Sequence, residues 1–192
     1  MPPKCKFTKQ EVVQAALDMT RESGIDSVTA RALGEKLGSS ARPIFSLFQS
    51  MGEVQQEVMQ GANALYQEYL AREMTAGEYP VYKASGMAYI RFAKEEKELF
   101  KLLFMRDRTG ETITDDPSIQ PILQLIMDKT GLSRREAFLF HLEMWVYVHG
   151  FATMIATSYL VWDWGDISQM LTDCFEGLKA RYLGREKQNG SH

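Results

Sequence analysis

The chain has 192 residues, of which 45% are hydrophobic and 24% charged, and its net charge is −3. These values are ordinary for a globular protein with one domain, or with a small domain joined to a medium one. No apolar run reaches the ~18 residues of a membrane span, and the first residues lack the apolar stretch of a secretory signal. Cys5 and Cys174 provide neither a disulfide framework nor metal-ligand spacing. We therefore expect a cytoplasmic protein with no membrane partner and no cofactor.

The charge is distributed unevenly along the chain. Residues 1–50 hold seven Lys and Arg against five Asp and Glu, whereas residues 51–192 hold 15 against 20. The first fifty residues are therefore the part of the chain that would tolerate a polyanion such as DNA.

Helical periodicity begins close to the N-terminus. Thr8 and Glu11 have the spacing of a capping box and predict a helix that starts there. A second, short helix is predicted over residues 29–37. Ser39 or Ser40 is expected to cap a third helix that carries several apolar side chains.

The rest of the chain is also predicted to be helical, because strand signals are nearly absent. The expected segments are a long helix from Ser50 and helices over about 80–95, 97–105, 117–131, 133–157 and 166–182. The fold class is therefore all-α, with about nine helices. The predicted domains are an N-terminal helix-turn-helix over 1–52, a helical ligand-binding and dimerisation bundle over 53–183, and a disordered tail over 184–192.

The first three helices have the layout of a helix-turn-helix, whose second helix lies in the major groove of DNA. Arg42 is placed to read a guanine through two hydrogen bonds, and Thr29 and Arg31 are placed to reach phosphate. An ordinary three-helix bundle would have the same layout, so the spacing alone leaves both readings open. The predicted DNA-binding residues are Lys6, Thr29, Arg31, Ser39, Ser40, Ala41, Arg42, Pro43, Phe45 and Ser46.

This segment resembles the TetR family of bacterial transcriptional regulators. The resemblance is carried by Ala15-Ala16-Leu17, Gly24, Val28-Thr29-Ala30-Arg31, Leu33-Gly34, Leu37-Gly38-Ser39-Ser40, Ile44-Phe45-Ser46-Leu47-Phe48 and Ser50-x-x-Glu53. It implies a DNA-binding head followed by a variable helical domain that senses a ligand and dimerises.

Three residues depart from the family's pattern. Phe45 stands where the family usually has a Tyr that contacts phosphate, and Met51 stands where a Lys usually supports the backbone contact. Gly34 replaces the usual Ala, which weakens its helix by roughly 1 kcal/mol. Together these departures predict weaker DNA binding than in a typical member.

The C-terminal part resembles one TetR subgroup, through the run from Trp145 to Gly150 and the aromatic-rich segment around Phe100. The effectors of this subgroup are diverse. The eleven methionines and many aromatic residues of the chain could line a pocket for an apolar or aromatic small molecule, although such residues at helical spacing are more often core. His149 is interpreted first as a core histidine hydrogen-bonded to a neighbour, and second as a ligand contact. The candidate ligand-binding residues are Phe92, Phe100, Phe104, Met105, Trp145, His149 and Tyr159.

The helices predicted over 133–157 and 166–182 carry more apolar surface than one subunit can cover. A four-helix interface with the same pair from a second chain would bury that surface, and the family resemblance implies the same arrangement. We therefore expect a homodimer that binds a palindromic operator in double-stranded DNA.

The combined features predict a ligand-responsive repressor, and two other functions compete with this interpretation. An enzyme is disfavoured because no nucleophile elbow, phosphate loop or paired-histidine motif is present, although His141, His149, Glu143, Asp163 and Asp166 could form an acid–base or metal site. The stronger alternative is a ligand-binding or interaction protein with a weakened DNA-binding head.

Overall fold

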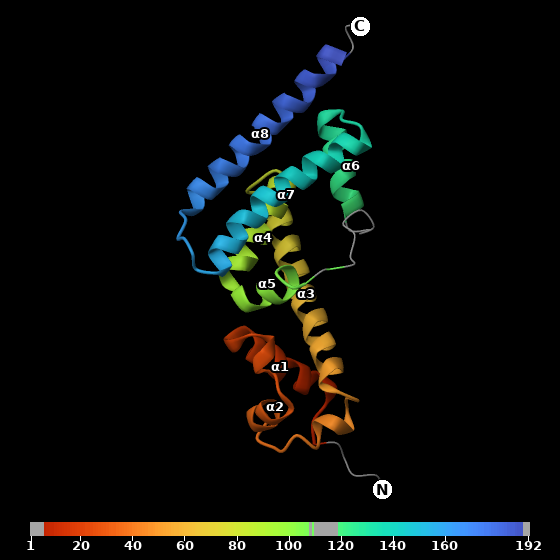
Figure 1. The fold of residues 1–192 in the computed structure, drawn as a ribbon, viewed down its shortest axis with the longest axis vertical. Coiled ribbons are helices and arrows are strands. Elements are labelled where there is room, and N and C mark those ends of the chain that lie inside the picture. The colour runs from red at the N-terminus through yellow and green to blue at the C-terminus, as the bar shows by residue number, and fades with distance from the viewer. Residues whose placement is uncertain (1–5, 108, 110–118, 190–192) are drawn as a thin grey trace. The chain divides into compact units, whose positions relative to one another are not determined.

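The computed structural model describes residues 6–107, 109 and 119–189, and every regular element in those ranges is a helix, as predicted. Eight α-helices lie in these ranges, together with two short 3-10 helices, η1 and η2 (Figure 1). The α-helices are α1 (Lys9–Ser23), α2 (Ala30–Lys36), α3 (Met51–Ala76), α4 (Val81–Glu95), α5 (Lys97–Phe104), α6 (Gln120–Thr130), α7 (Arg134–Ala156) and α8 (Trp164–Asn189). The 3-10 helices are η1 (Ile25–Ser27) and η2 (Ile44–Ser46).

The chain forms two compact units. Unit 1 comprises residues 1–68 and 95–106, and unit 2 comprises residues 69–94 and 107–192. Unit 1 thus includes α5 and most of α3 in addition to the predicted 1–52 domain. None of the described helices combines the length and the apolar character that a membrane crossing requires.

Local hydrogen bonds explain where several helices begin. Thr8 accepts a bond from the backbone N–H of Glu11, whose carboxylate accepts one in return from the N–H of Thr8. Ser133 and Glu136 make the same reciprocal pair at the start of α7. Both capping boxes satisfy amides that the helix itself leaves without a partner. The sequence predicted the box at Thr8 and a helix that starts near residue 133.

The prediction of a third α-helix after Ser39 or Ser40 is wrong. A turn and the short 3-10 helix η2 replace it, with backbone bonds of the i to i+3 type such as Ile44 N to Ala41 O and Ser46 N to Pro43 O. Pro43 provides the physical reason, because a proline disfavours the α conformation in the residue before it, here Arg42. The head therefore consists of two α-helices followed by a tight turn and one turn of 3-10 helix.

The core of unit 1 holds the head together. It is formed by buried apolar residues of α1, α2, η2 and α3, and Leu102 of α5 packs against it. These buried residues are Val12, Ala16, Met19, Val28, Leu33, Ile44, Phe48, Val54 and Val58. The turn that carries the predicted DNA-reading residues is thus anchored from beneath by Ile44 and Phe48.

In unit 2, α7 packs against α6 on one side and against α8 on another (Figure 1). Phe140 and Tyr182 join the three helices in one apolar cluster with Leu123 and Ile126. Gly131 ends α6 in the left-handed conformation that glycine adopts without strain, so α7 can turn back along α6. Unit 2 therefore presents α7 and α8 as neighbouring helices.

The last helix is longer than predicted. It begins at Trp164 rather than near residue 166, and it continues to Asn189 rather than ending near Tyr182. It therefore takes in most of the segment over 184–192 for which the sequence predicted a disordered tail.

Candidate functional site

The turn between α2 and η2 is held unusually close to α2. A Cβ atom on Gly34 would lie 2.9 Å from the backbone N of Ala41 and 2.9 Å from the carbonyl carbon of Ser40. Side chains essentially never approach backbone atoms so closely, so this packing requires glycine at position 34. The sequence interpretation treated Gly34 only as a weakening of α2 and missed this contact.

Arg42 is an exposed cation on this turn. Among the residues that the structure describes, no carboxylate forms an ion pair with it. Its neighbours Ser40, Phe45 and Ser46 are also exposed, whereas Ser39, Ala41 and Pro43 are half-buried. The turn therefore presents the guanidinium of Arg42 and the exposed residues Ser40 and Ser46 to solvent.

The other predicted DNA contacts lie in the same unit but already have partners. Arg31 donates to Glu35 at 2.9 Å, and this contact raises the pKa of Arg31. Lys6 donates to the carbonyl oxygen of Gly38 at 3.3 Å, and Thr29 caps α2 by accepting from Ala32. Binding of these residues to phosphate would compete with the existing contacts.

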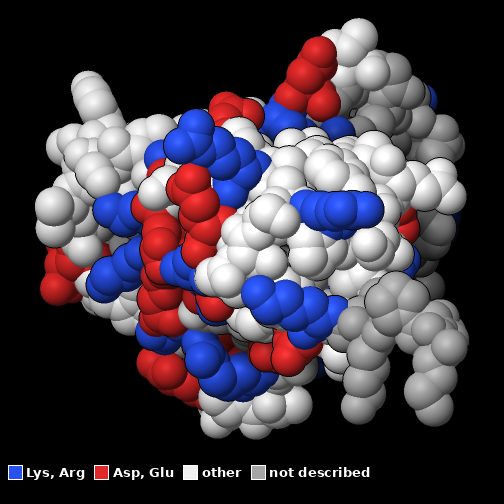
Figure 2. Space-filling view, turned by 90° about the horizontal axis from the view of Figure 1, so that it is seen from below, with Lys and Arg blue, Asp and Glu red and all other residues white. Residues whose placement is uncertain are grey.

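Acidic side chains also neutralise other cations of the head. Lys36 lies 3.0 Å from Glu22, and Lys9 lies 3.0 Å from Glu53. Figure 2 shows acidic side chains beside basic ones over much of the face that it presents. Four of the seven Lys and Arg counted in residues 1–50 therefore lie in ion pairs with carboxylates.

The seven predicted ligand-binding residues are divided between the two units. Phe100, Phe104 and Met105 belong to unit 1, and the other four belong to unit 2. Phe100 is fully buried and its ring centroid lies 5.2 Å from that of Phe104, while Met105 is 41% exposed. Phe100 and Phe104 therefore pack against each other, whereas Met105 is partly open to solvent.

In unit 2, Trp145 and His149 stack one turn apart on α7, with ring centroids 4.9 Å apart and nearly parallel planes. The hydroxyl of Tyr89 lies 2.9 Å from Nδ1 of His149, which is the neighbouring hydrogen-bond partner that the first interpretation expected. Desolvation by burial lowers the pKa of His149. The remaining two candidates differ in environment, since Phe92 is fully buried and Tyr159 is 74% exposed.

A second tyrosine–histidine pair repeats this arrangement along the same two helices. The hydroxyl of Tyr82 lies 3.1 Å from Nδ1 of His141, and burial lowers the pKa of that histidine as well. The two tyrosines are seven residues apart on α4 and the two histidines eight apart on α7. This near-match of helical spacing was a signal in the sequence that our interpretation did not use.

The side chains considered as an enzyme site make separate structural contacts. Glu143 accepts hydrogen bonds from Arg181 and Tyr182 of α8. Asp163 accepts from the backbone N–H groups of Gly165 and Asp166 at the start of α8. In the described part of the chain, no group of three or more His, Cys, Asp or Glu side chains has the arrangement of a metal site.

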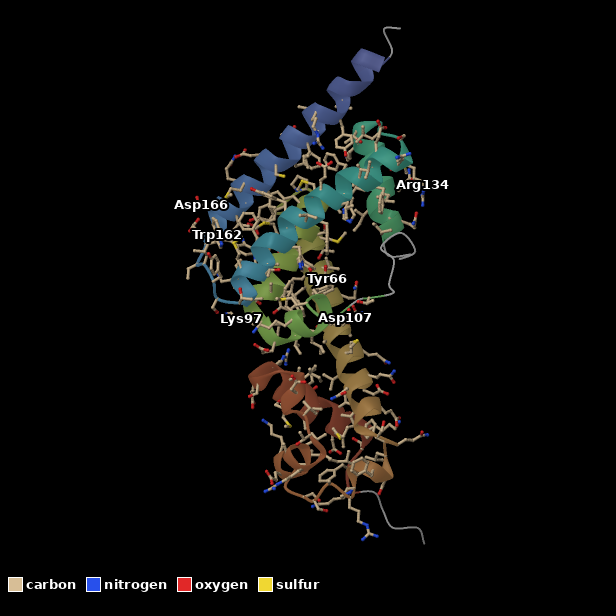
Figure 3. The ribbon with its side chains drawn as sticks, viewed as in Figure 1. Tyr66, Lys97, Asp107, Arg134, Trp162 and Asp166 are labelled. Atoms are coloured by element: carbon tan, nitrogen blue, oxygen red, sulfur yellow. The ribbon has the colours of Figure 1, made fainter. Side chains whose placement is uncertain are left out.

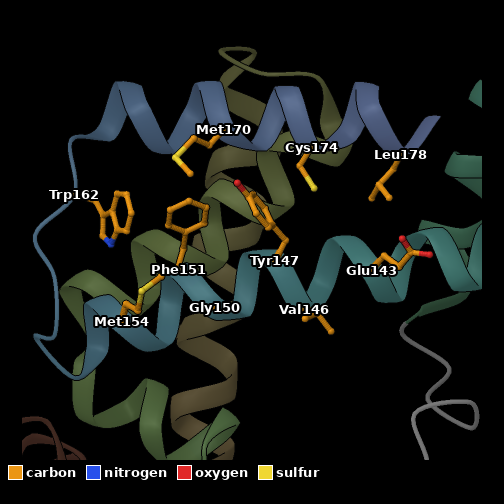
Figure 4. A pocket seen from close by; sticks show the side chains of 10 residues that line it. All are labelled: Glu143, Val146, Tyr147, Gly150, Phe151, Met154, Trp162, Met170, Cys174 and Leu178. Carbon is orange, nitrogen blue, oxygen red and sulfur yellow. The ribbon is translucent and has the colours of Figure 1, made fainter. Parts of the chain in front are cut away.

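An open apolar groove of about 390 Å³ runs between α7 and α8 (Figure 4). Glu143 marks one end, and Trp162 lies at the other, beside Phe151. The lining residues are Glu143, Val146, Tyr147, Gly150, Phe151, Met154, Trp162, Met170, Cys174 and Leu178. Val146 is 59% exposed and Leu139, two turns earlier on α7, is 40% exposed. The groove is thus lined mainly by apolar side chains, and Val146 among them stays open to solvent in the described chain.

Comparison with known families decides what kind of protein has these features. Residues 82–178, about half of the chain, match the family described as "Tetracyclin repressor-like, C-terminal domain". The chain belongs to the TetR family. A search of curated proteins found no match. The protein is therefore a transcriptional regulator of the TetR type, and the N-terminal head lies outside the matched residues.

Proposed function

We propose that this TetR-family protein is a ligand-responsive repressor that binds a palindromic operator as a homodimer. The observation that carries the proposal is the turn at residues 39–43. It is held against α2 at Gly34 and exposes Arg42, whose guanidinium forms no ion pair with any described carboxylate. In a TetR-family chain, such a turn is the part of the head best suited to read bases.

Arg42 is the proposed base-reading residue, because a guanidinium can donate two hydrogen bonds to guanine in the major groove. Thr29, Arg31 and Lys6 are the proposed phosphate contacts, since they are exposed in the same unit. Phosphate contacts position a protein on DNA without reading its sequence. The two groups should therefore respond differently to mutation.

The α7–α8 groove, with the exposed Val146 among its lining residues, supports the proposed homodimer. An exposed apolar surface favours burial against a partner. A second copy offers the same surface, and a two-fold arrangement would let each copy cover the other. Two-fold symmetry in the protein then matches two-fold symmetry in the operator.

The test is a binding titration with DNA from the promoter of the protein's own gene. We expect a saturable complex that survives excess unrelated DNA and weakens steeply with salt, because phosphate neutralisation releases counterions. Arg42→Ala should reduce the preference for promoter DNA, whereas Lys129→Ala, at an exposed cation of α6 in unit 2, should leave it unchanged. Equal affinity for promoter and unrelated DNA would contradict the proposal.

A second candidate function is supported by specific features of the head. Glu35 already holds Arg31, and Phe45 lacks the hydroxyl that the family usually places on phosphate. These features favour a ligand-binding or interaction protein with a weakened head. If the wild-type protein binds neither specific nor unrelated DNA at low salt, this alternative is the better description.

A further inference from the structure

A second groove in unit 2 lies where α6 and α7 both begin. Its volume is about 410 Å³, which falls within the range of small-molecule sites. It is lined by Ile119, Gln120, Leu123, Arg134, Arg135 and Phe138. None of these residues lines the α7–α8 groove, and none belongs to the ligand-binding set predicted from the sequence.

The floor of this groove is apolar and its rim is cationic. Ile119 and Leu123 are 8% and 2% exposed, so they belong to the core of unit 2, and Phe138 packs against that core. Arg134 and Arg135 are exposed at the start of α7, and Figure 3 shows Arg134 beside α6. A molecule that lies against the floor would therefore meet two guanidinium groups at one end.

Neither arginine is neutralised by a carboxylate in the part of the chain that the structure describes. Arg134 donates to the neutral amide oxygen of Gln120 at 2.6 Å. The one acidic side chain in the first turn of α7, Glu136, bonds instead to Ser133. Each guanidinium has five N–H donors, so both retain donors that can face the groove.

The position of the two arginines within α7 is unfavourable for the helix itself. The first turn of an α-helix carries partial positive charge, so cations there are destabilising. The start of α6 adds to this positive field, because Ile119 caps it without a side-chain hydrogen bond. Two cations next to an uncapped helix start create a local positive potential that an anion would relieve.

We propose that this groove binds an organic carboxylate with an apolar body, such as a medium-chain or aromatic acid. The carboxylate would accept hydrogen bonds from Arg134 and Arg135, and the apolar body would lie against Ile119, Leu123 and Phe138. Guanidinium groups pair with carboxylates through two parallel hydrogen bonds, which gives orientation as well as charge. The role of this ligand as an effector rests on the function proposed above, whereas the binding site itself does not.

The binding test uses calorimetric titration of the full chain with three probes at constant ionic strength. Octanoate has both the charge and the apolar chain, 1-octanol has only the chain, and inorganic phosphate has only the charge. We expect octanoate to bind and each of the other two probes to bind about tenfold more weakly or not at all. Equal binding of octanoate and octanol, or of octanoate and phosphate, would overturn the proposal.

Matched variants locate the site. Arg134→Gln combined with Arg135→Gln should weaken octanoate about tenfold or more, since both charged donors are lost. Lys129→Gln removes an exposed cation of α6 that does not line the groove, and it should leave octanoate affinity unchanged. Both changes are at exposed positions, and thermal unfolding checks that the variants remain folded. A double variant that binds octanoate as tightly as the wild type would refute the site.

A separate DNA-binding measurement tests whether the ligand of this groove acts as an effector. Saturating octanoate should release promoter DNA from the wild type but not from the double variant. If octanoate binds and DNA binding is unaffected, the site stands and its effector role is refuted. If the protein binds no DNA at all, the proposed repressor function fails, and the calorimetric titration still decides the site.

Discussion

Gly34 illustrates how a single residue can be judged wrongly from helix propensity. Alanine stabilises an isolated helix relative to glycine by roughly 1 kcal/mol. Here, however, the added methyl group would meet the backbone of Ser40 and Ala41 at 2.9 Å. Backbone atoms in a packed turn cannot move aside as a flexible side chain can, so the steric cost exceeds the gain in propensity.

We therefore expect Gly34→Ala to destabilise the protein by about 1–3 kcal/mol, the usual range for overpacking. Urea unfolding monitored by circular dichroism measures this free energy. Gly177→Ala in α8 is the matched control, because nothing lies within 4 Å of the added Cβ there. The control should be neutral or stabilising by up to about 1 kcal/mol. A stabilising Gly34→Ala would show that the turn can shift at little cost.

Arg42 and Arg31 provide a second residue-scale prediction. Arg42→Ala should weaken promoter binding by about 1–3 kcal/mol and relax the preference at one base pair. Arg31→Ala should weaken promoter and unrelated DNA equally and flatten the dependence on salt. Binding titrations over a series of single-base operator variants separate these outcomes. If Arg42→Ala changed only the salt slope, Arg42 would be a phosphate contact instead.

Removing the charge of Glu35 should strengthen DNA binding, whereas the substitutions of Arg42 and Arg31 should weaken it. Its ion pair with Arg31 is highly exposed, so it contributes little to stability. The same carboxylate would repel phosphate and compete for the guanidinium. Glu35→Gln should therefore strengthen binding to all DNA sequences several-fold and steepen its salt dependence, with little change in unfolding temperature. Unchanged DNA affinity would mean that Arg31 does not face the DNA.

At the scale of elements, the two tyrosine–histidine pairs connect α4 to α7. Burial lowers the pKa of both His141 and His149, so the folded protein favours their neutral forms. In the unfolded chain a histidine has a pKa near about 6.5 and takes up a proton more readily. Their contribution to stability is therefore complete above about pH 6.5 and is lost as the pH falls towards the lowered pKa of the folded state.

We expect the unfolding temperature to fall between pH 7.5 and pH 5.5, and the combined variant His141→Gln and His149→Gln to reduce that dependence. Thermal unfolding at the two pH values measures both. The pKa of the capping carboxylate of Glu136 is lowered chiefly by its hydrogen bond from Ser133, so it titrates below this window. An identical pH dependence in the variant and the wild type would exclude the histidines as its source.

For the whole molecule, the proposed dimer would cover the apolar groove between α7 and α8. Val146 is 59% exposed in the single chain, so a charged side chain there costs the monomer little. In the proposed dimer the same charge would be buried without a partner, which is strongly unfavourable.

Val146→Glu should therefore weaken the dimer at least about tenfold while leaving each chain folded. Sedimentation velocity at micromolar concentration distinguishes the two states. Val81→Glu, the same change at a 44% exposed position on α4, should leave the dimer intact. A wild-type protein that sediments as a monomer would contradict the proposed dimer outright.

Local sequence patterns were enough to predict the all-helical class and most helix ends. Capping boxes at Thr8 and Ser133 and the helix-ending Gly131 act through atoms within a few residues, so their effects can be read from local spacing. The sequence also placed the predicted DNA contacts together, and all of them lie in unit 1.

The remaining features depend on contacts between distant segments, so they could be seen only in the folded chain. The shape of the turn at residues 39–46 reflects its packing onto α2 and the core of unit 1 as well as the local effect of Pro43. The partners of His141 and His149 lie about sixty residues earlier in the chain. Both grooves likewise form between helices, and helical periodicity specifies an apolar face without specifying which element covers it.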